Sequence, residues 1–415
     1  MKSTILFIGD MNGNSQALAR RFVELGFKCE IIPYFEDYTN SNHFKYTKQQ
    51  SDILCHTDVN IYNGYPILAY LNFLGFFINP IINLFYKYRQ KPLQTPKATL
   101  KDLVSRTNLT IIGTGISPLL LKYLGKHMDI YYPSSQGVEF VSSPEGQANA
   151  QGFIKKIIYR ILKREMISAL KDVKLVVNSD VGLTHDVLCK INLKNYHLDI
   201  IPFVEPINQD IVPLRQTGNP SKLVMFSRLH WVRPKRHDES LWNFESKNND
   251  RFIYAFAKIL ANPKLKKELK LTIIEYGKDV ERTRQLVKDL AIQDYIEFHP
   301  IVRKEDILTY LNQYDILVGE FYNHNISIGG TGLEALQLQK PFLNGGWLYP
   351  EAKRRLQSEP PVYFCNNEIE IYDMLVNLTI KNYDPLLEKR KLFYEHLQSN
   401  GIIKSWLEAL QNEFK

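Results

Sequence analysis

The chain has 415 residues, of which 44% are apolar and 23% are charged. Because one hydrophobic core typically serves roughly 100–200 residues, this length predicts two domains, and the composition excludes collagen-like and low-complexity architectures. The formal net charge of +8 favours anionic partners. The basic residues are spread along the chain and do not form the aromatic-interleaved motifs of nucleic-acid binding, so we expect no nucleic-acid partner.

The first forty residues read as strand, turn, helix and strand. Apolar residues Thr4–Ile8 are followed by a turn with two glycines, the helical pattern Ser15–Leu25 and a second apolar run, Cys29–Pro33. This order predicts a βαβ unit. The start has no long apolar core with a small-residue cleavage site, so we expect the protein to stay in the cytoplasm.

Later apolar runs of the first half repeat this pattern. We expect strands at Leu109–Gly113, Asp129–Tyr132 and Val173–Asn178, each followed by a turn or a helical segment. Strands that alternate with helices predict an α/β fold whose parallel sheet is covered on both faces.

The segment Ile61–Tyr86 interrupts this series, because it has no charged residue and is rich in aromatic and aliphatic side chains. Its asparagines Asn72, Asn79 and Asn83 recur at helical spacing, and basic residues follow directly. Two interpretations stay open for residues 61–89. The segment is either an interfacial helix in the plane of a membrane or a helical pair packed on the sheet.

A second series of strands and helices begins near Ser221, after the proline-interrupted stretch Phe203–Pro220. We therefore divide the chain into an N-terminal Rossmann-like domain (1–205), a C-terminal Rossmann-like domain (206–385) and closing helices (386–415). The expected strands of the second domain are Lys222–Phe226, Leu271–Glu275, Tyr295–His299, Ile316–Val318, Pro341–Asn344 and Val362–Phe364.

The four cysteines lie far apart in the sequence. Cys29, Cys55, Cys189 and Cys365 form no CxxC pair and no metal-finger spacing. We therefore expect no disulfide framework and no metal site, and interpret them as buried, reduced cysteines.

A glycine-rich segment, Ser327–Leu336, follows an expected strand and opens a helix. Gly329, Gly330 and Thr331 would let a phosphate approach backbone N–H groups at the positive end of the helix dipole. Glu334, one turn into the helix, would then accept hydrogen bonds from ribose hydroxyls. The alternative is a loop that only turns the chain.

Five segments together resemble the large family four of retaining GT-B glycosyltransferases. The glycine segment continues to Asn344 as a "GGTGLEAL…KPFLN" pattern. The other four, in the family's order and spacing, are Phe226–Leu229, Lys247–Asp250, Ile273–Gly277 and Ile296–Val302. The resemblance implies the GT-B fold, two Rossmann-like doubly wound domains facing a central cleft, and transfer of a sugar from a nucleotide-diphosphate donor with retention.

The resemblance also assigns catalytic roles to Arg228 and Lys247, which would neutralise the donor diphosphate without a metal ion, and to Glu334. Tyr276, Gly277 and Val302 would bind the donor together with Gly329, Gly330 and Thr331. The chain departs from the family at Ile326, where a sugar-contacting glutamate is usual. Glu320 and His324, in the same loop, are candidate replacements.

On the acceptor side, the resemblance implies five candidates: Gly13, Asn14, Gly115, Ser135 and Gln136. His127 and His185 are further candidates for catalysis or sugar contact, with an ordinary structural histidine as the alternative for each.

We expect a glycosyltransferase of cell-surface glycan synthesis, such as lipopolysaccharide or capsule, peripheral at the inner face of the cell membrane. Its partners would be a nucleotide-diphosphate sugar, a glycan or lipid-linked acceptor and an anionic membrane surface, and it would need no cofactor. Two alternatives stay open. These are a catalytically silent partner protein on the same fold, motivated by Ile326, and a nucleotide-sugar epimerase.

Overall fold

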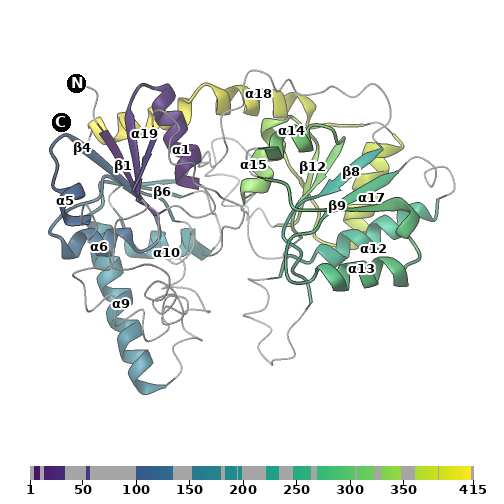
Figure 1. Cartoon of the computed structure of the whole chain (residues 1–415), viewed down its shortest axis with the longest axis horizontal. Coiled ribbons are helices and arrows are strands. Elements are labelled where there is room, and N and C mark those ends of the chain that lie inside the picture. The colour runs from purple at the N-terminus through teal and green to yellow at the C-terminus, as the bar shows by residue number, and fades with distance from the viewer. Residues whose placement is uncertain are drawn as a thin grey trace, which may run out of the picture. The chain divides into compact units, whose positions relative to one another are not determined.

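The computed structural model forms two compact units, which are described separately (Figure 1). Unit 1 comprises Met1–Ser179, Leu183–Ile201 and Ile403–Lys415, and unit 2 comprises Asp180–Gly182 and Pro202–Ile402. The structure describes residues 4–9, 14–32, 53–56, 100–133, 152–178, 183–193, 195–198, 221–232, 246–262, 269–303, 306–321, 329–346, 360–381 and 383–412. The boundary after residue 205 stays a prediction, since it lies outside these ranges.

Unit 1 is built on a parallel sheet in the order β3-β2-β1-β4-β5-β6-β7, the doubly wound order in which the chain starts in the middle and builds outward in both directions. Its strands are β1 (Thr4–Ile8), β2 (Lys28–Ile32), β3 (Ile53–Cys55), β4 (Leu109–Gly113), β5 (Ile130–Tyr131), β6 (Leu175–Asn178) and β7 (Tyr196–Leu198). The central strands β1, β4, β5 and β6 are almost fully buried because helices cover both faces, which is why they read as continuous apolar runs.

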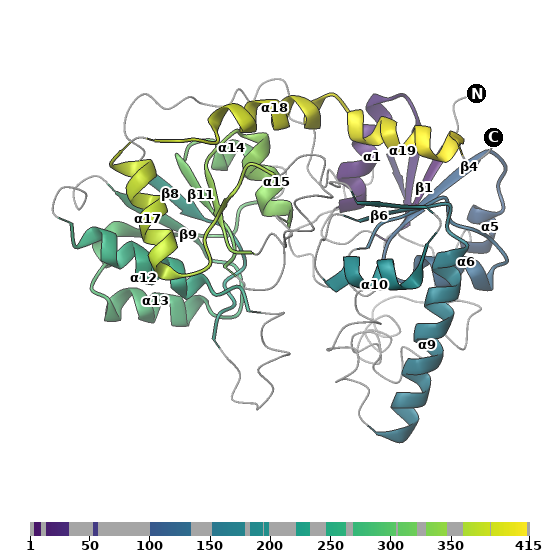
Figure 2. The ribbon, with the colours of Figure 1, turned by 180° about the vertical axis from the view of Figure 1, so that it is seen from behind.

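The helices of unit 1 lie on both faces of this sheet (Figures 1 and 2). On one face are α1 and α19, and on the other are α6, α9 and α10. The described helices are α1 (Asn14–Glu24), α5 (Leu100–Val104), α6 (Ser117–Tyr123), α9 (Phe153–Lys171), α10 (Leu183–Ile191) and α19 (Gly401–Asn412).

Unit 2 repeats the architecture, with a parallel sheet in the order β10-β9-β8-β11-β12-β13. The first strand of the unit, β8, is again central, and the order reverses direction between β8 and β11. The strands are β8 (Lys222–Met225), β9 (Lys270–Ile274), β10 (Ile296–His299), β11 (Ile316–Val318), β12 (Phe342–Asn344) and β13 (Tyr363–Phe364).

The helices of unit 2 also cover both faces of their sheet, with α12, α13 and α17 on one side and α14 and α15 on the other (Figures 1 and 2). Phe252, Phe256 and Phe321 stack in the core between the sheet and α12. The helices are α12 (Asn249–Leu260), α13 (Val280–Asp289), the 3-10 turn η1 (Gln293–Tyr295), α14 (Ile307–Leu311), α15 (Gly329–Gln337), α17 (Glu368–Thr379) and α18 (Leu387–Gln398).

The predicted α/β architecture is confirmed in both units, and the named strands lie within one or two residues of their expected bounds. The 19-residue helix α9 and the short strands β3 and β7 were not predicted. The interpretation of all cysteines as buried is wrong for Cys189, which is exposed. For Cys29 and Cys365, burial raises the thiol pKa to about 12, which keeps them protonated.

The segment 61–89 lies outside the described residues. Among the described residues, the structure has no helix that is both long and apolar enough to cross a bilayer. A search of the same residues finds no cluster of three or more histidine, cysteine or acidic side chains suited to a metal ion.

One polar cluster links β2 of unit 1 to the residues that follow β3 and α5. Glu30 on β2 accepts a bidentate hydrogen-bond pair from Arg106, both at 2.8 Å, and contacts His56 after β3 at 2.6 Å. Burial acts to raise the pKa of Glu30, but the hydrogen bonds from His56 and Arg106 outweigh it and lower that pKa to about 2.

Because this pKa lies below that of an unfolded glutamate, the Glu30 carboxylate stabilises the fold above about pH 4.5 and loses that effect as the pH falls toward 2. We predict that Glu30→Gln lowers the free energy of unfolding by roughly 1–3 kcal/mol at pH 5.5. Denaturant titrations at pH 5.5 and pH 3 check this. The difference between the two proteins should shrink by more than half at pH 3, and an unchanged difference would contradict it.

Candidate functional site

The carboxyl ends of β8 and β11 meet at the switch point of unit 2, where the strand order reverses. In open α/β sheets ligands bind at this position, because the loops leaving the two strands diverge to opposite faces and leave room between them. The residues after β8, Phe226–His230, and those after β11, Gly319–Phe321, are therefore the first place to look for a site.

A buried hydrogen-bond network fixes these two loops. The Ser227 hydroxyl donates to the carbonyl of Gly319 at 2.8 Å and accepts from the Asn249 side-chain amide at 2.9 Å. The Asn249 carbonyl oxygen in turn accepts from the backbone N–H of His230 at 3.1 Å. Ser227 and Asn249 are 1% and 0% exposed. Since buried polar groups are costly to leave unsatisfied, the network locks the loops together across the switch point.

Arg228 is exposed and lies between the two fixed residues Ser227 and Leu229. The backbone N–H of Leu229 donates to the carbonyl of Tyr276 at 2.6 Å, which joins the loop after β8 to the loop after β9. Gly277 has φ +122°, and a Cβ there would lie 2.3 Å from the Leu229 carbonyl oxygen. Glycine is required at this crossing, and the structure brings the predicted residues Arg228, Tyr276 and Gly277 to one edge.

Lys247 is held just before α12 by both loops. Its backbone N–H donates to the carbonyl of His230 at 2.6 Å, and its carbonyl accepts from the N–H of Phe321 at 2.8 Å. Its ammonium group lies 2.6 Å from a carboxylate oxygen of Glu320, and the side chains are 13% and 20% exposed. A lysine cation is therefore fixed at the switch point, in an environment drier than bulk water.

Glu320 is itself positioned by the last residue of β12 and the residue that follows it. The side-chain oxygen of the buried Asn344 accepts from the Glu320 N–H at 2.8 Å, and the Gly345 N–H donates to the Glu320 carbonyl at 2.5 Å. A Cβ at Gly319 would lie 2.4 Å from the Asn344 oxygen, so this close approach also needs glycine. Backbone contacts on both sides thus define the direction in which the Glu320 carboxylate reaches Lys247.

The predicted phosphate-binding segment opens α15, the helix that follows β11. Gly329 has φ +57° and is exposed, and Gly330 and Thr331 are half-buried in the first turn. A Cβ at Gly330 would meet nothing within 4 Å. Open space beside the first backbone N–H groups of a helix is suited to an anion. Glu334, one turn on, is buried.

Of the remaining donor-side candidates, one is described by the structure and two are not. Val302 follows the edge strand β10, which is separated from β8 by β9, so the structure does not bring it to the switch point. His324 and Ile326 lie outside the described residues.

The corresponding edge of unit 1 is formed where β1 and β4 diverge. Ser15, in the first turn of α1, lies 2.5 Å from both the Gly9 carbonyl oxygen and the Tyr132 hydroxyl. The Gly115 carbonyl accepts from the Tyr131 hydroxyl at 3.1 Å, and Gly115 is buried. Among the acceptor-side candidates, Gly115 and Asn14, the first residue of α1, are at this edge. Gly13, Ser135 and Gln136 lie outside the described residues.

The structure supports a role at this edge for neither of the two histidine candidates. His127 is exposed and precedes β5, so it lies at the opposite, amino-terminal edge of the sheet. His185 is buried in α10, where its Nδ1 lies 2.6 Å from the Tyr196 hydroxyl, which also accepts from Asn178. This contact supports the structural alternative for His185.

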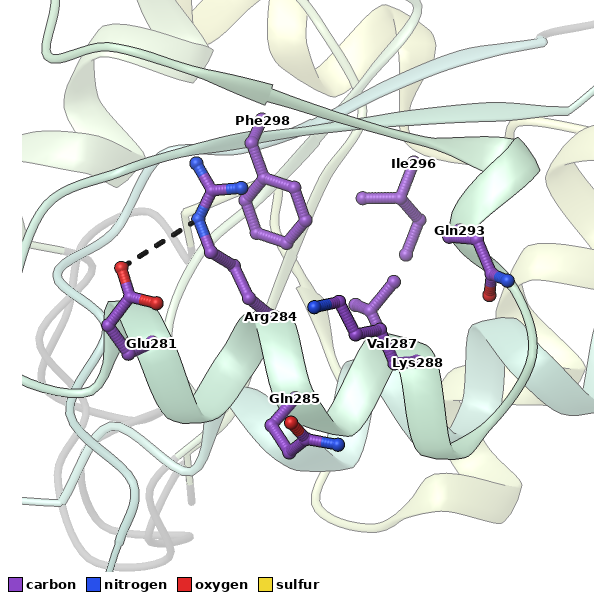
Figure 3. A pocket seen from close by; sticks show the side chains of 8 residues that line it. All are labelled: Glu281, Arg284, Gln285, Val287, Lys288, Gln293, Ile296 and Phe298. Carbon is purple, nitrogen blue, oxygen red and sulfur yellow. Dashed lines mark ion pairs between the residues drawn. The ribbon is translucent and has the colours of Figure 1, made fainter.

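A pocket of about 240 Å³ lies elsewhere in unit 2, between α13 and β10 (Figure 3). The Arg284 guanidinium lies 4.4 Å from the centre of the Phe298 ring and pairs with Glu275 and Glu281. Among the described residues, no predicted site residue lines this pocket.

Sequence reasoning missed the residues that position the cations. Ser227 and Asn249 lie next to expected elements and Asn344 ends an expected strand, but the contacts that give them their role join segments far apart in the chain. All three lie in segments that carry the family resemblance, but the resemblance assigned no role to them.

Gly277 and Gly330 should respond differently to a methyl group. We predict that Gly277→Ala lowers the free energy of unfolding by at least about 2 kcal/mol, because the Cβ meets the Leu229 backbone at positive φ. Gly330→Ala should change it by less than about 1 kcal/mol, since the space is open. Denaturant unfolding of both variants is the measurement. Equal effects would contradict the close approach of Gly277 to the Leu229 backbone.

No protein-family model and no curated protein sequence matches this chain. Solved structures resemble it over nearly their whole length, among them the following three. A UDP-forming α,α-trehalose-phosphate synthase from Burkholderia xenovorans is 14% identical, with TM-score 0.55 over 99% of both chains. A sucrose-phosphate synthase from Thermosynechococcus elongatus is 11% identical, with TM-score 0.54 over 100% of this chain and 99% of that chain.

The third is S. aureus TarM, solved as a variant in complex with fondaparinux, α-GlcNAc-glycerol and UDP. It is 11% identical, with TM-score 0.53 over 98% of this chain and 99% of that one. These similarities, together with two doubly wound parallel sheets, confirm the fold that the sequence resemblance implied, while membership of the retaining family four stays a prediction. The chain has the GT-B fold.

Proposed function

We propose that this protein is a glycosyltransferase that moves a sugar from a nucleotide-diphosphate donor to an acceptor hydroxyl, with the donor bound by unit 2. The observation that carries the proposal is the cation Lys247, fixed 2.6 Å from Glu320 at the switch point. Arg228 lies in the same loop system, and the open helix start at Gly330 follows the neighbouring strand. Two cations and a helix N-terminus are suited to stabilise the charge on a diphosphate leaving group.

In the proposed reaction the acceptor oxygen forms a bond to the anomeric carbon while the bond from that carbon to the diphosphate oxygen breaks. The electron pair of the broken bond stays on the diphosphate, and the acceptor proton goes to a phosphate oxygen of the leaving group. Charge on the diphosphate grows during this step, so the cations stabilise the transition state more than the bound donor. Because Arg228 and Lys247 supply the positive charge, we propose that no metal ion is required.

Glu320 has a positioning role in this proposal. In the free protein it neutralises Lys247, so the cation is held in place without a bound anion. Its carboxylate also replaces part of the polarity lost with Ile326, where the resembled family has an acid. A hydroxyl of the donor sugar could donate a hydrogen bond to the Glu320 carboxylate. That carboxylate has a defined position, because the backbone N–H and carbonyl of Glu320 are both hydrogen-bonded.

The similar structures support the nucleotide class. One is described as a UDP-forming synthase and another was solved with UDP, so a uridine diphosphate sugar is the first donor to test. We further propose retention at the anomeric carbon, a glycan or lipid-linked acceptor of the cell surface, and a peripheral location at the inner membrane face. These finer assignments rest on the sequence resemblance and the net charge of +8.

We predict that Lys247→Met and Arg228→Ala each lower the turnover of the donor by about 100-fold or more, by removing charge that faces the leaving group. Nucleotide release from UDP-, GDP-, ADP- and CMP-sugars is the assay, with and without glycan acceptors. Lys288→Met, which removes one exposed charge from α13, is the matched control and should leave turnover unchanged.

The double variant Lys247→Met/Glu320→Gln removes both charges of the pair, and its thermal melting separates a loss of activity from a loss of fold. Turnover by either Lys247 variant at the rate of the intact protein would overturn the assignment. Nucleotide binding without turnover in the intact protein would instead support the silent partner. Interconversion of free nucleotide sugars without an acceptor would support the epimerase.

A further inference from the structure

Helix α9 of unit 1 has two different halves. Its second half is anchored in the core through Leu162, Met166 and Leu170, and the Lys122 ammonium on α6 binds Glu165 and Ser168, both at 2.9 Å. Its first half extends away from the sheet and from the other described helices of its unit (Figures 1 and 2). The anchored half therefore holds the projecting half in a fixed direction.

The projecting half exposes three large apolar side chains. Phe153 is 80% exposed, Ile157 is 41% exposed and Ile161 is 47% exposed. Their spacing of four residues places them along one stripe, on the face of the helix opposite to the buried Tyr159 and Leu162. An aligned group of exposed apolar side chains on one element differs from the scattered ones that surfaces normally carry, and indicates a binding surface.

Basic residues border this stripe. Lys156, Arg160 and Arg164 are exposed on the same side, again four residues apart. The helix as a whole contains six lysines and arginines and a single acidic residue, Glu165. This positive charge indicates which kind of partner the exposed face of α9 binds. A second copy of α9 would bring like charges together, which disfavours self-association, whereas an anionic surface complements both the charge and the apolar stripe.

We propose that the exposed face of α9, defined by Phe153, Lys156, Ile157, Arg160 and Ile161, binds an anionic lipid surface with the helix lying in the plane of that surface. The apolar side chains enter the boundary between headgroups and acyl chains, and the basic side chains reach the anionic headgroups. The site uses residues other than those of the 61–89 segment. It rests on the peripheral membrane location proposed above and names its surface, and it does not depend on the donor chemistry of unit 2.

Vesicle flotation of the full chain tests the proposal. Intact protein should float with vesicles of phosphatidylcholine mixed with phosphatidylglycerol, and should not float with phosphatidylcholine alone. The double variant Lys156→Glu/Arg160→Glu should bind the mixed vesicles about 30-fold more weakly or worse, since each basic residue near an anionic surface contributes about 1 kcal/mol. The double variant Phe153→Ser/Ile157→Ser should lose binding at every salt concentration.

Two controls keep the test specific. Lys389→Glu/Lys404→Glu makes the same charge change at exposed positions on α18 and α19, and Leu392→Ser removes an apolar side chain that is 67% exposed. Both should bind like the intact protein, and the α9 variants should melt at its temperature because the changed side chains are exposed. The proposal is wrong if the intact protein ignores the mixed vesicles, or if the α9 variants bind them as well as the controls do.

Discussion

The contact between Lys247 and Glu320 organises the candidate site of unit 2, because it joins the segment before α12 to the loop after β11 at the switch point. A lysine here would otherwise be a mobile charge on a long side chain. Backbone hydrogen bonds with His230 and Phe321 fix the Lys247 main chain, and Asn344 fixes that of Glu320. Fixing a cation before the ligand arrives is the general requirement for stabilising charge that develops during a reaction.

Much of the fold could be predicted from the sequence, because buried parallel strands read as uninterrupted apolar runs. Thr4–Ile8 and Leu109–Gly113 are examples, and both lie in the middle of their sheet. The edge strands β3 and β7 are only three residues long and carry too little pattern. Helix α9 was also missed, although its apolar residues recur at helical spacing, because its exposed half carries apolar side chains on the outer face as well as on the buried one.

The site was predictable at the level of residue types and not of contacts. Arg228, Lys247 and Gly277 were assigned because the resemblance preserves their order, and the structure brings them to one edge, while their roles stay predictions. Val302 was assigned by the same reasoning but follows an edge strand. The network of Ser227, Asn249 and Gly319 joins positions up to 92 residues apart, and such pairings depend on tertiary packing that no local pattern encodes.

The central claim, that unit 2 binds a nucleotide through its diphosphate, is tested most directly by calorimetric titration of the intact protein. Nucleoside diphosphates, the matching monophosphates and the free nucleosides form the ligand series, beginning with UDP, UMP and uridine. The fixed Lys247 and exposed Arg228 predict saturable binding of one diphosphate, with the monophosphate at least about tenfold weaker because a charged group is lost. Equal binding of the two phosphates, or no binding of any nucleotide, would contradict the account.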